Sequence, residues 1–311
     1  MSRPGSIPSR LPMGDPASGT PPPVVEGPVA VVGLGLMGGS LARALHSLPA
    51  APNVLGVDAD PVSGAQALES GVIQRFDPDG TALVGEARTV VYAVPLGALA
   101  PLLASHRRLF HPDALITDVL SLKGPTHRLI GEAGLAQRFV GSHPMAGGEG
   151  QGFGAARDDL FRGARIWLTG EDQAEPEYRS RAMAFWAALG GKVEWIDAEE
   201  HDQRMAWVSH LPQLVANALA GALDAAGFRP GDLGPGGRDM TRLAGSSPEM
   251  WKELLPHSAV ITGTGLTSVS RALNVVADLL ARREVDRIAE FMERTRAWSV
   301  REESVRGEGD A

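Results

Sequence analysis

The chain has 311 residues, of which 43% are hydrophobic and 21% are charged, as is typical of a folded globular protein of one or two domains. Its formal net charge of −8 argues against a broad nucleic-acid-binding surface. With no cysteine, the chain can form neither disulfides nor thiolate metal sites. It has no apolar run long enough to cross a membrane and no apolar segment like that of a secretory signal, so we expect a cytoplasmic protein.

Two terminal segments are expected to lie outside the folded part. Residues 1–27 are rich in Pro, Ser and Gly, and this composition disfavours regular helices and sheets. The last residues are polar. We therefore predict a disordered tail over 1–27 and a frayed tail over 301–311.

Between these tails, short apolar runs alternate with helix-compatible segments. The predicted strands cover residues 29–32, 53–57, 89–93, 114–117, 139–141, 164–168 and 192–195. Such alternation predicts a parallel sheet with helices on both faces, in a domain spanning 28–195. After about Asp197 only Ala- and Leu-rich helical patterns remain, so we predict an all-α domain over 196–300.

The segment Gly33-Leu34-Gly35-Leu36-Met37-Gly38 matches the Gly-x-Gly-x-x-Gly pattern of dinucleotide-binding loops, directly after a strand and at the start of a helix. Gly33 suits the tight turn, Gly35 permits close approach of a pyrophosphate, and Gly38 permits close packing of the helix on the strand. The free N–H groups at the helix start would bind the phosphates. This context predicts a Rossmann-type N-terminal domain.

Asp58 ends the second predicted strand, about 20 residues after the last glycine of the loop, where a carboxylate accepts hydrogen bonds from the ribose hydroxyls. A 2′-phosphate would be repelled there, so the sequence favours NAD over NADP. The residues assigned to cofactor binding are Gly33, Gly35, Leu36, Met37, Gly38, Asp58, Val94 and Pro95. The alternative is a Gly-rich turn without a ligand and a surface aspartate.

Two polar segments, 117–124 and 141–147, follow predicted strands, and ligands of open α/β sheets bind outside these strand ends. His143 is the candidate general base, because its ordinary pKa of about 6.5 suits proton transfer near neutral pH. Ser121 could orient the imidazole or a substrate hydroxyl. The alternatives are a structural loop histidine and a turn or capping serine. Asp118 is expected to order its loop, and Lys123 either contacts an anion or is solvated.

Taken together, these segments resemble the prephenate/arogenate dehydrogenase family of tyrosine biosynthesis. The resemblance covers roughly residues 28–300 and continues through the later segments Glu200-His201-Asp202, Val208-Ser209-His210-Leu211-Pro212 and Asp239-Met240-Thr241-Arg242, followed by Trp251. It implies an NAD-dependent oxidative decarboxylation of prephenate to 4-hydroxyphenylpyruvate, of arogenate to tyrosine, or of both.

The resemblance also implies roles for single residues. His143 would take the proton of the substrate hydroxyl, and Ser121 would orient that hydroxyl. Arg242 would bind a substrate carboxylate, since a guanidinium pairs with it in a bidentate way, and Asp239 would hold the Arg242 region. Without the resemblance, Arg242 is a surface arginine paired with Asp239.

The helical domain carries two further histidines, nine residues apart. On one regular helix, His201 and His210 would lie on opposite faces, so we assign His210 to the substrate site and treat His201 as structural. Many prephenate-using relatives carry a histidine where this chain has Gln213. Because glutamine cannot carry a positive charge, we assign Gln213 to substrate binding and hypothesise that arogenate is accepted. No metal-ligand spacing is present, so no metal site is expected.

Members of this family pair through their helical domains, so a homodimer is expected. The apolar segments 211–223 and 273–280 would suit such an interface, or could equally form an intrachain core.

Two other functions remain open. A related hydroxyacid-type dehydrogenase would use a lysine of the helical domain, but Lys252, the candidate there, has no matching motif around it. A non-catalytic NAD-binding protein would leave His143, Ser121 and Arg242 without a role.

Overall fold

The computed structural model describes residues 24–148 and 150–299, so the predicted tail over 301–311 and most of that over 1–27 lie outside it. The described chain divides into two compact units. The sheet unit comprises the chain up to Val94, Leu103–Val119 and Ala133–Trp195. The helical unit comprises Pro95–Leu102, Leu120–Glu132 and the chain from Ile196 on. The sequence did not indicate that the short segments 95–102 and 120–132 belong with the helices.

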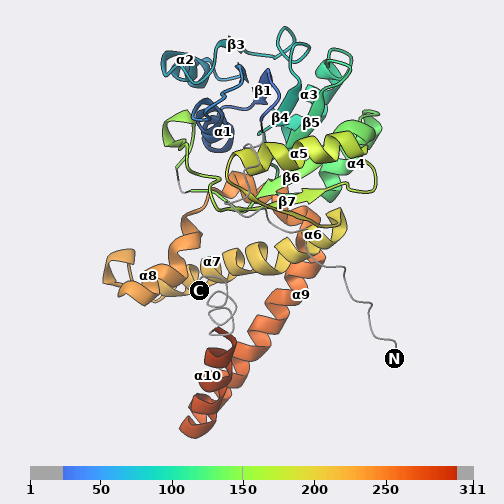
Figure 1. The fold of residues 1–311 in the computed structure, drawn as a ribbon. Coiled ribbons are helices and arrows are strands. Elements are labelled where there is room, and N and C mark those ends of the chain that lie inside the picture. The colour runs from blue at the N-terminus through green and yellow to red at the C-terminus, as the bar shows by residue number, and fades with distance from the viewer. Residues whose placement is uncertain (1–23, 149, 300–311) are drawn as a thin grey trace, which may run out of the picture. The chain divides into compact units, whose positions relative to one another are not determined.

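The sheet unit is built on one eight-stranded sheet (Figure 1). Its strands are β1 (Val29–Val32), β2 (Val54–Val57), β3 (Arg75–Asp77), β4 (Thr89–Tyr92), β5 (Leu115–Asp118), β6 (Phe139–Pro144), β7 (Arg165–Thr169) and β8 (Lys192–Trp195). The order is β3-β2-β1-β4-β5-β6-β7-β8, and the strands run parallel except that β7 is antiparallel to β6. This arrangement confirms the predicted Rossmann-type fold, whose strand order reverses between β1 and β4.

The helices are bounded by recognisable local signals. They are α1 (Leu36–His46), α2 (Pro61–Glu69), α3 (Leu96–His106), α4 (Gly124–Glu132), α5 (Pro176–Ala188), α6 (Ala198–Met205), α7 (Leu211–Ala225), α8 (Pro235–Thr241), α9 (Pro248–Ala281) and α10 (Val285–Ser299). Five of them, α2, α5, α7, α8 and α9, have proline in their first turn, where its missing N–H costs nothing. Asp60 caps α2 and Asp197 caps α6, each accepting two backbone N–H groups.

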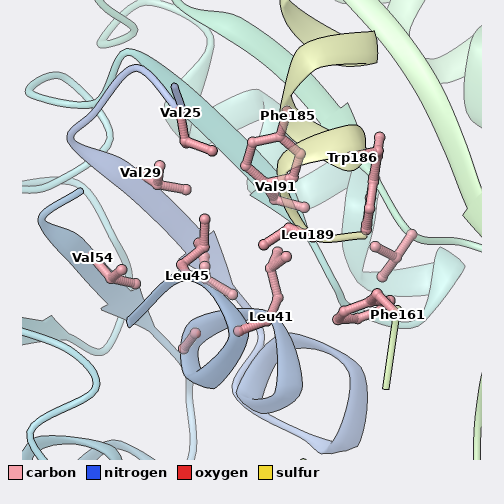
Figure 2. Close-up of a cluster of buried hydrophobic side chains, with 14 of the residues drawn as sticks. Val25, Val29, Leu41, Leu45, Val54, Val91, Phe161, Phe185, Trp186 and Leu189 are labelled. Carbon is pink, nitrogen blue, oxygen red and sulfur yellow. The ribbon is translucent and has the colours of Figure 1, made fainter. Parts of the chain in front are cut away.

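The core of the sheet unit lies between the sheet and two helices. Leu41 and Leu45 of α1 converge with Phe185 and Trp186 of α5 on the side chains of one sheet face, including Val91 (Figure 2). All four residues of β1, β2, β4 and β5 are buried, so the opposite face is covered too. Strands buried on both faces explain the continuous apolar runs in the sequence.

Three details differ from the sequence-based prediction. Val25 is 6% exposed and packs in this core, so the packed chain begins before residue 28. The strand β3 was not predicted, because it has only three residues, two of which are charged, and none of them is buried. The strand β6 continues past Gly141 to Pro144, because pairing with the antiparallel β7 extends it.

The helical unit is dominated by the 34-residue helix α9, the long orange helix of Figure 1, against which α10 packs. Only a few α9 side chains are buried, and Leu273, Val275 and Leu280 are more than half exposed. Segment 273–280 is therefore mostly exposed in the single chain, although Leu279 is buried. Within residues 24–148 and 150–299, no helix has the length and apolarity needed to span a membrane.

Candidate active site

The glycine loop between β1 and α1 has the geometry that its spacing predicts. Gly33 adopts φ +96°, a backbone conformation that disfavours side chains, and a Cβ there would collide with the carbonyl of Ala93. A Cβ on Gly38 would collide with the carbonyl oxygen of Gly33, whereas one on Gly35 would meet open space. Gly35 is also the N-cap of α1, and no side chain caps this helix. The open space beside Gly35 and the uncapped helix start suit a phosphate group.

Asp58 stands directly after β2 and is tied to this loop. Its Oδ2 accepts a hydrogen bond from the N–H of Leu34 at 2.6 Å, and its Oδ1 accepts one from the N–H of Asp60 at 2.8 Å. These two bonds hold a negative charge beside the glycine loop, at the end of the strand. A ribose diol fits such a carboxylate, and a 2′-phosphate does not.

Two further segments come close to this loop. Val94, which follows β4, lies close enough that a Cβ on Gly33 would come within 3.0 Å of its Cγ1. A Cβ on Gly148, in the segment after β6, would lie 3.7 Å from Cδ2 of Leu36. Because the strand order reverses between β1 and β4, these residues line the position where open α/β sheets bind ligands.

His143 lies in β6, where it pairs with Trp167 of β7, and its side chain is half-buried. The preceding residue, Ser142, is held from three directions. Its N–H donates to Oδ1 of Asp118 at 2.9 Å, and its hydroxyl pairs with that of Thr117 at 2.8 Å. The same hydroxyl accepts a hydrogen bond from the indole N–H of Trp186 at 2.8 Å. The backbone that carries the imidazole is therefore fixed by a buried polar network.

Asp118 is 0% exposed and bonds to backbone, as expected for a residue that orders this region. Lys123 is also 0% exposed, so the interpretation of it as a solvated lysine is wrong.

Ser121 belongs to the helical unit and precedes α4, whose start is capped by Asp202 of α6. The two carboxylate oxygens of Asp202 accept the N–H groups of Lys123 at 2.8 Å and Gly124 at 2.9 Å. Nδ1 of His201 lies 2.8 Å from Oδ1 of the same carboxylate. Burial raises the pKa of Asp202, but these hydrogen bonds outweigh burial and hold the pKa below its ordinary value. His201 thus contacts the carboxylate that caps the segment after Ser121.

His201 and His210 are both buried, at 0% and 1% exposure. Between them, residues Ala206–His210 form a π-helical turn, so the opposite-face argument for a regular helix does not apply. The structure thus departs from a regular α-helix between the two histidines.

His210 sits against Trp251 and Ser258 of α9. Its Nδ1 lies 2.8 Å from the hydroxyl of Ser258, and its ring packs edge-on against Trp251 at 5.5 Å between centroids. Burial lowers the pKa of His210, Asp202 opposes this shift and His201 adds to it. The indole Nε1 of Trp251 is buried and has no hydrogen-bond partner within the described residues. Such a donor is costly unless a ligand or water accepts its hydrogen.

Gln213 lies one turn after His210 and is 4% exposed. Its Nε2 donates to Oδ1 of Asn217 at 2.8 Å and to the carbonyl of Leu243 at 2.7 Å, and its Oε1 accepts from the hydroxyl of Ser246 at 3.2 Å. Arg242 is exposed at the start of the short helical turn η5 (Arg242–Gly245). Asp239 is exposed on α8.

The assigned residues therefore fall into two groups. The sheet unit contains the glycine loop, Asp58, Val94 and His143, and the helical unit contains Pro95, Ser121, His210, Gln213, Asp239 and Arg242.

Comparison with known proteins decides the family. Residues 41–195 match the family model "Prephenate dehydrogenase, nucleotide-binding domain", and residues 197–294 match "Prephenate dehydrogenase, dimerization domain". The chain belongs to the prephenate dehydrogenase family. It is 31% identical to the prephenate dehydrogenase of Bacillus subtilis over 74% of this chain, and it spans 64% of that relative's length.

Two solved structures share the family fold over most of the chain. The Aquifex aeolicus prephenate dehydrogenase, in complex with hydroxyphenyl propionate and NAD+, is 29% identical with a TM-score of 0.79, covering 88% of this chain and 96% of its own. Synechocystis arogenate dehydrogenase is 27% identical with a TM-score of 0.70, covering 86% and 97%.

Within this family assignment, sequence reasoning missed the supports of the site. Ser142 and Asp202 lie in segments that carried the resemblance, but nothing local shows that they bond to residues far along the chain. Trp186 and Ser258 stand in no motif. Only the fold brings them to His143 and His210.

Proposed function

We propose that this chain catalyses the NAD-dependent oxidative decarboxylation of prephenate, arogenate or both, in tyrosine biosynthesis. The observation that carries the proposal is the placement of His143. It lies at the carboxyl-terminal end of β6, within the nucleotide-binding unit, on backbone fixed by the Asp118–Ser142–Trp186 network. A base held in this way suits proton transfer.

The cofactor is NAD, which accepts the hydride from C4 of the substrate ring when it is bound. The residues of the sheet unit fit it. The loop from Gly33 to Gly38 and the open backbone at Gly35 would hold the pyrophosphate, and Asp58 would accept hydrogen bonds from the ribose. Val94 and Pro95, after β4, would border the rest of the cofactor.

The chain's own chemistry is one proton transfer and the positioning of the substrate. As the C4–H hydride leaves, the imidazole of His143 takes the proton of the 4-hydroxyl, and the ring carboxylate departs as CO2 with its bonding electrons staying in the ring. The ring becomes aromatic, which drives the reaction, so positioning contributes more than activation. Ser121 orients the hydroxyl.

Binding of the substrate falls to the helical unit. Arg242 pairs with a substrate carboxylate, and His210 and the unpartnered indole N–H of Trp251 supply polar contacts beside it. Since burial lowers the pKa of His210, it is neutral near pH 7 and acts by hydrogen bonding. Lys252, the acid–base candidate of the alternative dehydrogenase class, is exposed and ion-paired with Glu249 at the surface.

The experiment that tests the proposal follows NADH absorbance with purified protein, NAD and each of the two substrates in turn. Turnover of either substrate supports the proposal, and arogenate turnover supports the hypothesis drawn from Gln213. Lack of turnover with both substrates, and with NADP in place of NAD, would refute the activity while leaving the fold assignment intact.

The chain also forms a homodimer in this proposal, through the helical unit. Leu273 and Leu280 are seven residues apart on α9, hence on one face, and are 64% and 62% exposed. Exposed apolar stripes of this kind are typical of interfaces. A second copy of the chain is the expected occupant, because residues 197–294 match a dimerization domain.

A further inference from the structure

Gln213 of α7 is 4% exposed, and its amide is almost completely engaged within the chain. Both N–H bonds of a glutamine amide are available as donors, and here they go to Asn217 and to the carbonyl of Leu243. The amide oxygen accepts from Ser246. No amide N–H is left to donate to a substrate carboxylate or ketone.

Two of these three bonds reach the same short segment. Leu243 directly follows Arg242, and Ser246 follows the end of η5. The carbonyl of Leu243 accepts both Nε2 of Gln213, at 2.7 Å, and the N–H of Ser246, at 3.0 Å, so both of its lone pairs are used. The hydroxyl of Ser246 then returns to Oε1 of Gln213. The side chain of Gln213 therefore joins the turn formed by η5 and Ser246 to helix α7 through two hydrogen bonds.

This turn lies near the surface, where it packs against α7 and α8. Neither α8 nor η5 has a buried residue. A buried glutamine that makes two hydrogen bonds to such a segment restricts it strongly, because its amide would be left unsatisfied if the segment moved away.

We propose that Gln213 is a positioning residue that sets the place of Arg242, and that it acts on substrate binding through this turn rather than by touching the substrate. The proposal rests on the proposed function, in which Arg242 pairs with a substrate carboxylate. A histidine at this position cannot make the same bonds, because a neutral imidazole has one donor and one acceptor.

The test compares Gln213→Met, which keeps the length of the side chain but not its hydrogen bonds, with Asn217→Ala. The second variant removes a partner of the same amide that has no link to η5. We expect Gln213→Met to raise the substrate KM roughly tenfold, as the loss of a buried hydrogen bond would, with kcat and the KM for NAD nearly unchanged. Asn217→Ala is expected to leave the substrate KM unchanged. If Gln213→Met folds poorly, Gln213→Glu replaces it, because glutamate has the same shape as glutamine but its carboxylate has no hydrogen-bond donor.

A second readout does not depend on turnover. Hydrogen–deuterium exchange of the peptide containing residues 242–247 should be faster in Gln213→Met, again roughly tenfold at the Ser246 amide, and Ser246→Ala should give a smaller effect in the same direction. Unchanged exchange, or a substrate KM that moves equally in Asn217→Ala, would overturn the proposal. If the wild-type protein turned over neither substrate, the proposed function would fail and the exchange measurement alone would decide on Gln213.

Discussion

The sheet unit and the helical unit hold their site residues by different means. In the sheet unit, Asp118 and Ser142, which support His143, are both 0% exposed, and the strands around them are buried on both faces. In the helical unit, α8, η5 and α10 have no buried residue, and Arg242 is exposed. A buried hydrogen-bond network therefore fixes the backbone beside His143, whereas Arg242 lies on short surface helices to which Gln213 donates a hydrogen bond.

The largest effect is expected at the base itself. His143→Asn should lower kcat by about 10²- to 10⁴-fold, the range of general base catalysis, because asparagine can hydrogen-bond but cannot take the proton. Cofactor affinity, measured by quenching of tryptophan fluorescence with NAD, should stay within about twofold of the wild type, since the loop around Gly35 is untouched. Unchanged turnover would revive the non-catalytic alternative.

The next largest effect is expected on self-association, from substitutions at Leu273 and Leu280, the exposed leucines on one face of α9. Leu273→Glu combined with Leu280→Glu should weaken self-association by at least about 100-fold, because two carboxylates would be buried in an apolar interface. Sedimentation velocity over a concentration series measures this change. Val62→Glu, at a 60% exposed apolar residue of α2 in the sheet unit, is the matched control and should not alter association. A double variant that stays dimeric would place the interface elsewhere.

A smaller effect is expected from the support of His143. Trp186→Phe keeps an aromatic ring in the core but removes the indole donor to Ser142, so the free energy of unfolding should fall by about 1 kcal/mol. Urea denaturation reports this loss. Trp298→Phe, at a 75% exposed residue of α10, should leave stability unchanged. Equal stability of both variants would show that the indole bond contributes nothing.

The smallest effect is a pH dependence in the helical unit. Burial lowers the pKa of His210 below its ordinary value of about 6.5, so below that pH the unfolded chain binds more protons than the folded one. Stability should therefore be complete above about pH 6.5 and fall as the pH drops towards the folded pKa. The groups facing His210 are Asp202, which raises its pKa, His201, which lowers it, and the uncharged Ser258 and Trp251.

Urea unfolding across this pH range should show a shallower loss in His210→Gln than in the wild type. His46→Gln, at an exposed histidine of α1, is the control and should follow the wild type. Parallel curves for all three proteins would assign the pH dependence to other groups.

The sequence by itself determined the features that depend on neighbouring residues. Apolar runs predicted strands β1, β2, β4 and β5, because strands buried on both faces must be continuously apolar. The glycine loop was predictable because each glycine answers a local steric demand, such as the positive φ of Gly33. His143 could be predicted as the candidate base because it follows a predicted strand.

Tertiary structure decided what depends on residues far apart in the chain. The extension of β6 to Pro144 requires pairing with β7, and the π-helical turn before α7 broke the expected phase between His201 and His210. Asp202 caps a helix that begins 78 residues before it, and Gln213 bonds to a turn 30 residues after it. Hydrogen bonds of this kind depend on where the packed elements place two side chains, and no local pattern encodes that placement.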